Sequence, residues 1–302
     1  MEAQYLSDLV HHSLFGGPEF RRILYSKDPP LSEDNIQLVQ AAMLMMVLQA
    51  AREVFDINRR IRTQCFPALV SVIRSLGLTR VLNGTEHYGQ PAILDDYVHQ
   101  ETLVRIISWA YLFDSYIVIY HRSPPHFKIV EANFGLPRHD ALFDTIDHAE
   151  WESVIPNTDR YYSPVSLKVV VQQLMDDQPI HPNEMLRHIN TLFALSLVLS
   201  ALHSILFDIQ ALGSFIYATN ALIPIERALD RWKELYDMFY PDFRTSKASR
   251  SGFMIHSLEF WWLAKRFVQR PDVALNGENF AADFIKSFHG IVQELKASNE
   301  DG

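Results

Sequence analysis

The stretch ETLVRIISWAYLFDSYIVIYHRSPP, from Glu101 to Pro125, decides the fold of this chain. No proline or glycine interrupts the sequence between Pro91 and Pro124, so roughly seven helical turns can form without a break. The ring of Pro124 is incompatible with the interior of a helix and restricts the residue before it, so we expect the helix to stop there. The sequence therefore predicts one long helix over about residues 95–122.

This predicted helix is apolar on nearly all of its faces. Between Ile106 and Tyr120 the polar residues are only Ser108, Asp114 and Ser115. A helix of this kind packs inside a protein of substantial size. A carboxylate in its middle needs hydrogen-bond donors or a raised pKa. Asp114 is therefore either a structural acid bound by backbone amides or a neighbouring arginine, or a polar group that lines a ligand pocket.

The composition predicts an all-α fold. The chain has 302 residues, of which 48% are hydrophobic and 12% aromatic, and only 11 are glycine. Residues that favour helices are plentiful, and no window alternates in the manner of paired strands with tight turns. No flexible linker or repeat divides the chain. We expect one large helical domain over residues 1–296, with a polar tail at 297–302.

Capping residues and prolines place the other helices. Ser32 is the expected N-cap of a helix that runs through the segment LVQAAMLMMVLQAAREVFD. Asp95 or Asp96 is the expected N-cap of the central helix. Further helices are predicted over residues 58–76, ended by Gly77; from Ser163-Pro164 to 177; from Pro182 to 211; and over 223–239, 252–268 and 279–296.

Charge and cysteine content limit the function. The net charge is −9, which opposes tight binding to phosphate-rich nucleic acid. The basic clusters are short and are interpreted as solvated faces; they are Arg59, Arg60 and Arg62, and Arg244, Lys247 and Arg250. The single cysteine, Cys65, excludes a disulfide framework and a multi-cysteine zinc site, and we expect it to be a buried thiol.

Two membrane signals were considered. The first fifteen residues lack a basic region followed by a long apolar run, so no signal peptide is expected. The apolar stretch Leu192–Ile209 carries serines and a histidine at helical spacing, which favours a buried core helix over a membrane span.

The sequence contains one candidate pattern for metal binding. The thirteen histidines include no pair at ligand spacing, and His121 and His126 beside the Pro-Pro corner are expected to be exposed. Asp95 and Asp96, followed by Glu101, resemble the acidic magnesium motif of class I terpene cyclases. The second metal motif of those enzymes is missing, and acidic residues are favoured at a helix N-terminus in any case. An all-α enzyme of that type remains the alternative.

One face of the central helix carries a regular series of polar and aromatic residues. Glu101, Arg105 and Trp109 follow one another at four-residue spacing. We therefore expect an ion pair between the first two and a cation–π contact between the last two.

The same residues carry a family resemblance. The pattern Arg-x-x-x-Trp-x-x-x-aromatic-Asp resembles the signature of the fungal transcription factor regulatory domain, also called the middle homology region or xylanolytic activator regulatory domain. The residues that carry it are Arg105, Trp109, Phe113 and Asp114, with the closing Pro124 and Pro125. Upstream, LVQAAMLMMVLQ and SLGLTR are similar to the helical pair of that family. Downstream, ALDRWKELYD and GFMIHSLEFWWLAKRF look like the branch that carries two-cysteine two-histidine zinc fingers. The resemblance covers about residues 1–270.

The resemblance implies a non-enzymatic domain in the nucleus that regulates transcription. In this family zinc and DNA are bound by a separate module, and this chain contains no residue set for either. The resemblance further implies partners among the transcription machinery or co-regulator proteins, with burial of a small hydrophobic effector as the other mode of control. No catalytic, cofactor or metal residue is predicted in this chain, and the signature residues are predicted to be structural. A helical protein-interaction scaffold is a further alternative.

Overall fold

The structure is a computed structural model of the 302-residue chain, and it confirms the all-α prediction. It describes residues 2–52, 54–83, 94–145, 147, 149–151, 153, 164–178, 181–213, 219–239, 254 and 256–269. These residues contain no β-strand, only an isolated antiparallel bridge between Gly135 and Ser166. The predicted helix at 279–296 and the basic cluster at 244–250 lie outside the described residues.

The helices differ widely in length, from four residues to 28. The α-helices are α1 (Glu2–Gly16), α2 (Pro18–Tyr25), α3 (Glu33–Ala50), α4 (Phe55–Arg60), α5 (Phe66–Ser75), α6 (Leu94–His121), α7 (Asp140–Phe143), α9 (Leu167–Met175), α10 (Pro182–Met185), α11 (Leu192–Gly213), α12 (Ile223–Phe239) and α13 (Ser257–Gln269). A π-helical turn (Ile61–Cys65) joins α4 to α5, and 3₁₀ turns lie at Leu78–Arg80, Ile129–Glu131 and Thr219–Leu222.

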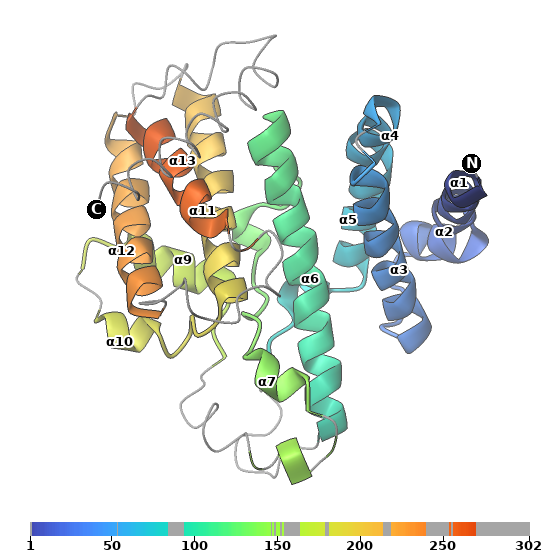
Figure 1. The fold of residues 1–302 in the computed structure, drawn as a ribbon, viewed down its shortest axis with the longest axis horizontal. Helices are drawn as coiled ribbons and strands as arrows, with labels where there is room; N and C mark the ends of the chain where they lie inside the picture. The colour runs from blue at the N-terminus through green and yellow to red at the C-terminus, as the bar shows by residue number, and fades with distance from the viewer. Residues whose placement is uncertain are drawn as a thin grey trace.

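The central helix is confirmed within one residue at each end. Figure 1 shows α6 between α3, α4 and α5 on one side and α11, α12 and α13 on the other. Asp95 and Asp96 lie inside its first turn, so neither is the predicted N-cap. Two acidic residues in this position still interact favourably with the positive end of the helix dipole.

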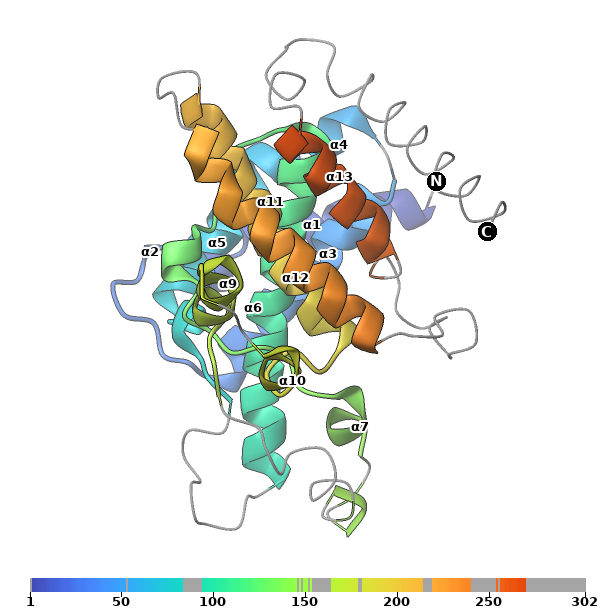
Figure 2. The same ribbon diagram turned by 90° about the vertical axis from the view of Figure 1, so that its left-hand side faces the viewer.

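The second long apolar helix is α11, which packs against α6 and also against α12 and α13 (Figure 2). The prediction that one helix runs from Pro182 to residue 211 is wrong. Pro182 begins only the short helix α10. The long helix α11 starts at Leu192, and the hydroxyl of the preceding Thr191 accepts a hydrogen bond from the backbone N–H of Ala194. Such a hydroxyl acceptor starts a new helix by satisfying an N–H that has no partner in the first turn.

The length and composition of α6 and α11 would suffice to cross a membrane. In each case 72% of the most apolar window is buried inside the protein. Burial of this extent is typical of core helices, as the sequence predicts for the α11 segment.

Other helix boundaries follow local capping rules. Ser32 is the N-cap of α3 as predicted, because its Oγ accepts the backbone N–H of Asn35 at 3.4 Å. The predicted helix at 58–76 is instead α4, the π-helical turn and α5 in sequence. The N-cap of α9 is Ser166, three residues after the predicted start, and its Oγ accepts the N–H of Val169.

Gly77 ends α5 in the left-handed region, with φ of 73°. Replacing it by alanine should lower the free energy of unfolding by about 1 kcal/mol, since a side chain disfavours this backbone conformation although the space around it is open. Gly16→Ala is the matched control: Gly16 lies at the end of α1, where a Cβ would make only ordinary contacts, so we expect no loss. Urea denaturation measures both, and equal effects would contradict the conformational explanation.

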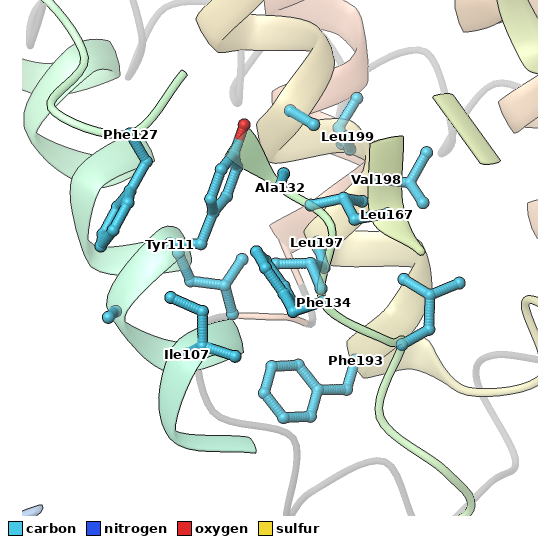
Figure 3. Packing of buried hydrophobic residues seen from close by; sticks show 14 of the residues in the cluster. Ile107, Tyr111, Phe127, Ala132, Phe134, Leu167, Phe193, Leu197, Val198 and Leu199 are labelled. Carbon is cyan, nitrogen blue, oxygen red and sulfur yellow. The ribbon is translucent and has the colours of Figure 1, made fainter. Parts of the chain in front are cut away.

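Within the described residues, one large cluster of buried hydrophobic residues extends from α2 to α13, and a small second cluster contains Tyr97, Leu142 and Trp151. The centre of the large cluster is the space between α6 and α11, where the chain from residue 126 to residue 138 passes through. Figure 3 shows Phe134 on this segment, between Ile107 and Tyr111 of α6 and Leu197 of α11. The segment is therefore part of the core and is not a surface loop.

The seam between α11 and α13 contains a buried imidazole. The Nε2 atom of His203 lies 2.9 Å from the carbonyl oxygen of Phe260, and burial lowers the pKa of His203 to about 4. The folded state therefore favours neutral His203, and its stability should fall as the pH drops from about 6.5 towards 4.

Replacing His203 by phenylalanine should flatten this part of the pH profile. The slope should decrease by up to about 1.4 kcal/mol per pH unit, the linkage value for one proton. Urea unfolding of both proteins between pH 7 and 4 measures the slopes. Superimposable slopes would contradict a neutral buried His203.

Candidate functional site: two buried carboxylates on the central helix

The central helix carries two buried acids, Glu101 and Asp114, thirteen residues apart. At 1.5 Å rise per residue their backbones are about 20 Å apart along the axis. Glu101 is 0% exposed and Asp114 is 2% exposed. Both bind the crossing segment, which we define as residues 126–138. A buried carboxylate is stable only when donors satisfy its oxygens, so the donors around each explain its position.

Glu101 accepts three hydrogen bonds. Its Oε1 accepts the backbone N–H of Arg138 at 2.9 Å and Nε–H of Arg105 at 2.8 Å. Its Oε2 accepts Nδ2–H of Asn83 at 2.7 Å. Burial raises the pKa of Glu101, and the charge of Arg105 and the three donors oppose this rise. The carboxylate therefore joins the chain before α6, the helix itself and the end of the crossing segment.

Asn83 completes this arrangement from the other side. Its Nδ2 also donates to the carbonyl oxygen of Leu136 at 3.1 Å. Gly135 lies against the Asn83 side chain so closely that a Cβ at position 135 would collide with it. The N–H of Gly135 donates to the carbonyl oxygen of Val81 at 2.8 Å. A residue larger than glycine is therefore excluded at this point of the crossing segment.

Arg105 bridges the helix and α7. Besides Glu101, it binds Oδ1 of Asp140 at 2.8 Å and the carbonyl oxygen of Arg138 at 3.1 Å. Its guanidinium lies over the ring of Phe143, 4.3 Å from the centroid. The predicted ion pair with Glu101 is confirmed. The predicted cation–π contact with Trp109 is wrong, because the guanidinium turns towards α7, where it gains an aromatic ring and a second acid.

Asp114 binds the other end of the crossing segment. Its Oδ2 accepts the backbone N–H of Phe127 at 2.7 Å, and its Oδ1 lies 2.9 Å from Nδ1 of His126. Asp114 is thus bound by a backbone amide, which supports its interpretation as a structural acid. The prediction that His126 is exposed is wrong, since its side chain is only 24% exposed and contacts this carboxylate. His121 is also partly buried, and burial lowers its pKa to about 4.

Arg74 of α5 holds the same end of the crossing segment from the opposite side. It donates to the carbonyl oxygen of His126 at 2.6 Å and forms a two-pronged ion pair with Glu131, at 2.6 and 2.8 Å. Its guanidinium also lies 5.7 Å from the ring centroid of Phe127. The crossing segment is thus bound to α5 and α6 together, and it returns along α6 in the opposite direction.

The turn that begins this return follows α6 directly. Arg122 adopts φ of 49° and donates to Oε1 of Gln210 at 3.0 Å. Its guanidinium packs 5.0 Å from the ring centroids of both Phe207 and Phe267, which offsets the cost of the left-handed backbone. Pro124 is exposed and Pro125 is buried. The predicted stop at the Pro-Pro corner is confirmed, and α6 ends at His121.

The remaining signature residues, Trp109 and Phe113, lie outside this hydrogen-bond arrangement. Trp109 is 38% exposed and packs against Phe193 of α11, with ring centroids 5.1 Å apart. Phe113 packs against Phe66 of α5 at 5.2 Å. They therefore join α6 to the helices on its two sides.

The chemistry of this site is that of a structural junction. The carboxylates face N–H donors and a guanidinium, so neither is placed to activate water or hold a metal ion. Among the residues that the structure describes, no group of three His, Cys, Asp or Glu could hold a metal. Asp95 and Asp96 lie at the far N-terminal end of α6. A terpene-cyclase centre receives no support from this geometry.

Sequence reasoning missed the donors that satisfy the two acids. These are Asn83, Arg138 and Phe127. The ion pair of Arg74 with Glu131, which also holds the crossing segment, was missed as well. These residues lie between 13 and 57 positions from their partners, so no helical or strand periodicity could have linked them. The available signal was indirect: two acids in an apolar helix require donors from elsewhere.

Comparison with known proteins identifies relatives of this chain. A family described as the fungal specific transcription factor domain matches residues 11–234. The chain is also similar to transcription factor verF of Penicillium polonicum, with 29% identity over 272 residues. This match covers 82% of the chain and 36% of verF, so the chain spans about a third of its relative's length. No solved structure matches the chain.

Proposed function

Because this chain belongs to the fungal specific transcription factor domain family, we propose that it is the regulatory part of a longer transcription factor that acts in the nucleus. The match to the family over residues 11–234 carries this proposal. The domain regulates transcription, and its family is not one of enzymes. Alignment with only 36% of verF supports the view that such a domain works beside other modules.

We infer that contact with DNA is made by a module other than this domain. The net charge of −9 opposes phosphate binding, and the single cysteine cannot form a zinc finger. The described residues likewise offer no metal-binding group, so they do not fit the zinc that the resemblance implies. The sequence similarity of segments 228–237 and 252–267 supports a two-cysteine two-histidine finger as that module.

We propose structural roles for the signature residues. Arg105 and Asp114 attach the crossing segment, Trp109 and Phe113 attach α6 to its neighbours, and the Pro-Pro corner turns the chain. The continuous hydrophobic cluster from α2 to α13 supports a single domain over residues 1–296. The proposed partners are co-regulator proteins or components of the transcription machinery. A small effector would change how the domain binds these partners.

The test is recruitment of the domain to a promoter. The 302-residue chain, fused to an unrelated DNA-binding domain in a fungal cell, should change expression of a reporter several-fold in either direction. The unrelated DNA-binding domain alone is the baseline. Glu101→Ala, which breaks the junction, should return expression towards that baseline, whereas Asp140→Ala should not. Expression equal to the baseline for the wild-type fusion would contradict the proposal.

A further inference from the structure

A cluster of polar side chains lies away from the carboxylate junction, between α1, α3 and the π-helical turn. Its members are the buried His11, Gln49 and Cys65 and the half-buried Arg60. His11 is 6% exposed, Gln49 0% and Cys65 4%. The backbone departs from regular α-helix here, since Arg60 directly precedes the π-helical turn and Cys65 ends it. Single π-helical turns within helices occur frequently at functional sites.

Two contacts hold the cluster together. The Sγ atom of Cys65 lies 3.5 Å from Nε2 of His11. Nη2 of Arg60 donates to Oε1 of Gln49 at 3.4 Å. Burial is the main influence on the pKa of His11 and Cys65, and the positive charge of Arg60 lowers the pKa of both groups as a second influence.

The protonation states follow from burial. Burial lowers the pKa of His11 to about 4 and raises that of Cys65 to about 11, so both are neutral near pH 7. The thiol can then donate its S–H to Nε2 of His11, which leaves the ring proton on Nδ1.

Three N–H groups in the cluster have no hydrogen-bond partner within the described part of the chain. They are Nδ1 of His11, Nε2 of Gln49 and Nε of Arg60, and each of these atoms is buried. Buried donors without a partner are rare and costly, so such a group calls for an acceptor. A water molecule is a poor match, because its own two hydrogens would find no acceptor among these three donors.

The cluster also carries an unbalanced positive charge. No acidic side chain forms an ion pair with Arg60 among the described residues. The nearby Asp8 is paired with Arg52, at 3.3 Å. The neighbouring donors are neutral, so none of them balances the charge of the guanidinium.

We propose that this cluster is a binding site for a small carboxylate. A carboxylate has two acceptor oxygens and a negative charge, which match three buried N–H donors without an acceptor and the positive charge of the guanidinium. The thiol of Cys65 borders the site. Control of transcription by this binding rests on the proposed function. The binding of the carboxylate does not depend on that function.

Butyrate is a suitable probe, with butyramide as its neutral analogue of the same shape. Butyrate at 20 mM should raise the Tm of the 302-residue chain by about 2 °C, whereas sodium chloride and butyramide at the same concentration should not. Because Cys65 is the only cysteine of the chain, alkylation by iodoacetamide reports on this site alone. Butyrate should slow that reaction by at least about threefold.

Arg60→Gln should abolish both effects, and Arg59→Gln is its matched control, with the same loss of charge on the exposed neighbouring residue. If Arg60→Gln does not fold, Gln49→Leu takes its place. A butyrate effect no larger than that of chloride, or an unchanged effect in the Arg60 variant, would overturn the proposal and leave ordered water as the occupant. If butyrate binds but the promoter fusion leaves reporter expression at the baseline, the binding site stands and the proposed regulatory function is overturned.

Discussion

Replacing Glu101 by alanine should lower the free energy of unfolding by about 4 kcal/mol, the range expected when one partner of a buried ion pair is removed. The carboxylate is fully buried and accepts from Asn83, Arg105 and the backbone of Arg138. Its loss leaves these donors without their acceptor in an interior that water cannot reach. Urea denaturation followed by circular dichroism measures the change.

Asp140→Ala is the control for this substitution. Asp140 also binds Arg105, but its side chain is 68% exposed, so its removal should cost less than about 1 kcal/mol. A loss for Glu101→Ala no larger than that for Asp140→Ala would show that burial of the carboxylate contributes nothing to stability.

Replacing Asp114 by alanine should cost about 3 kcal/mol. The main reason is the buried backbone N–H of Phe127, which would lose a charged acceptor at 2.7 Å, and the contact with His126 is lost with it. Thermal or urea unfolding measures this effect.

Asp208→Ala provides the comparison. Asp208 binds the same crossing segment through Nζ of Lys128, at 2.8 Å, yet its side chain is 41% exposed. Its loss should cost less than about 1 kcal/mol, because water replaces the ion pair. Equal losses for the two aspartates would contradict the assignment of Asp114 as the acid that fixes the segment.

The parts of the fold that depend on local sequence were predictable. The length of α6, its burial and its stop before Pro124 follow from apolar composition and proline chemistry alone. The N-cap at Ser32 and the break at Gly77 follow from side-chain and backbone preferences of single residues. The start of α11 was not predictable in the same way, since Pro182 gives a valid helix start that the chain uses only for one short turn.

The site was predictable only in part. Two acids in an apolar helix already require donors, and the Glu101–Arg105 spacing predicts the ion pair. The identity of the other donors depends on how the chain folds back after the Pro-Pro corner. The contact of Arg105 with Phe143 also depends on this fold-back, because the crossing segment brings α7 next to Arg105.

We infer that Glu101 and Asp114 fix the crossing segment in the core of a regulatory domain. Native-state hydrogen exchange of the amides of Phe127 and Arg138 tests it most directly, because these two N–H groups donate to the two carboxylates. Both amides should exchange as slowly as those in the middle of α6, through global unfolding alone. Exchange at the rate of an exposed loop, while α6 stays protected, would contradict the claim.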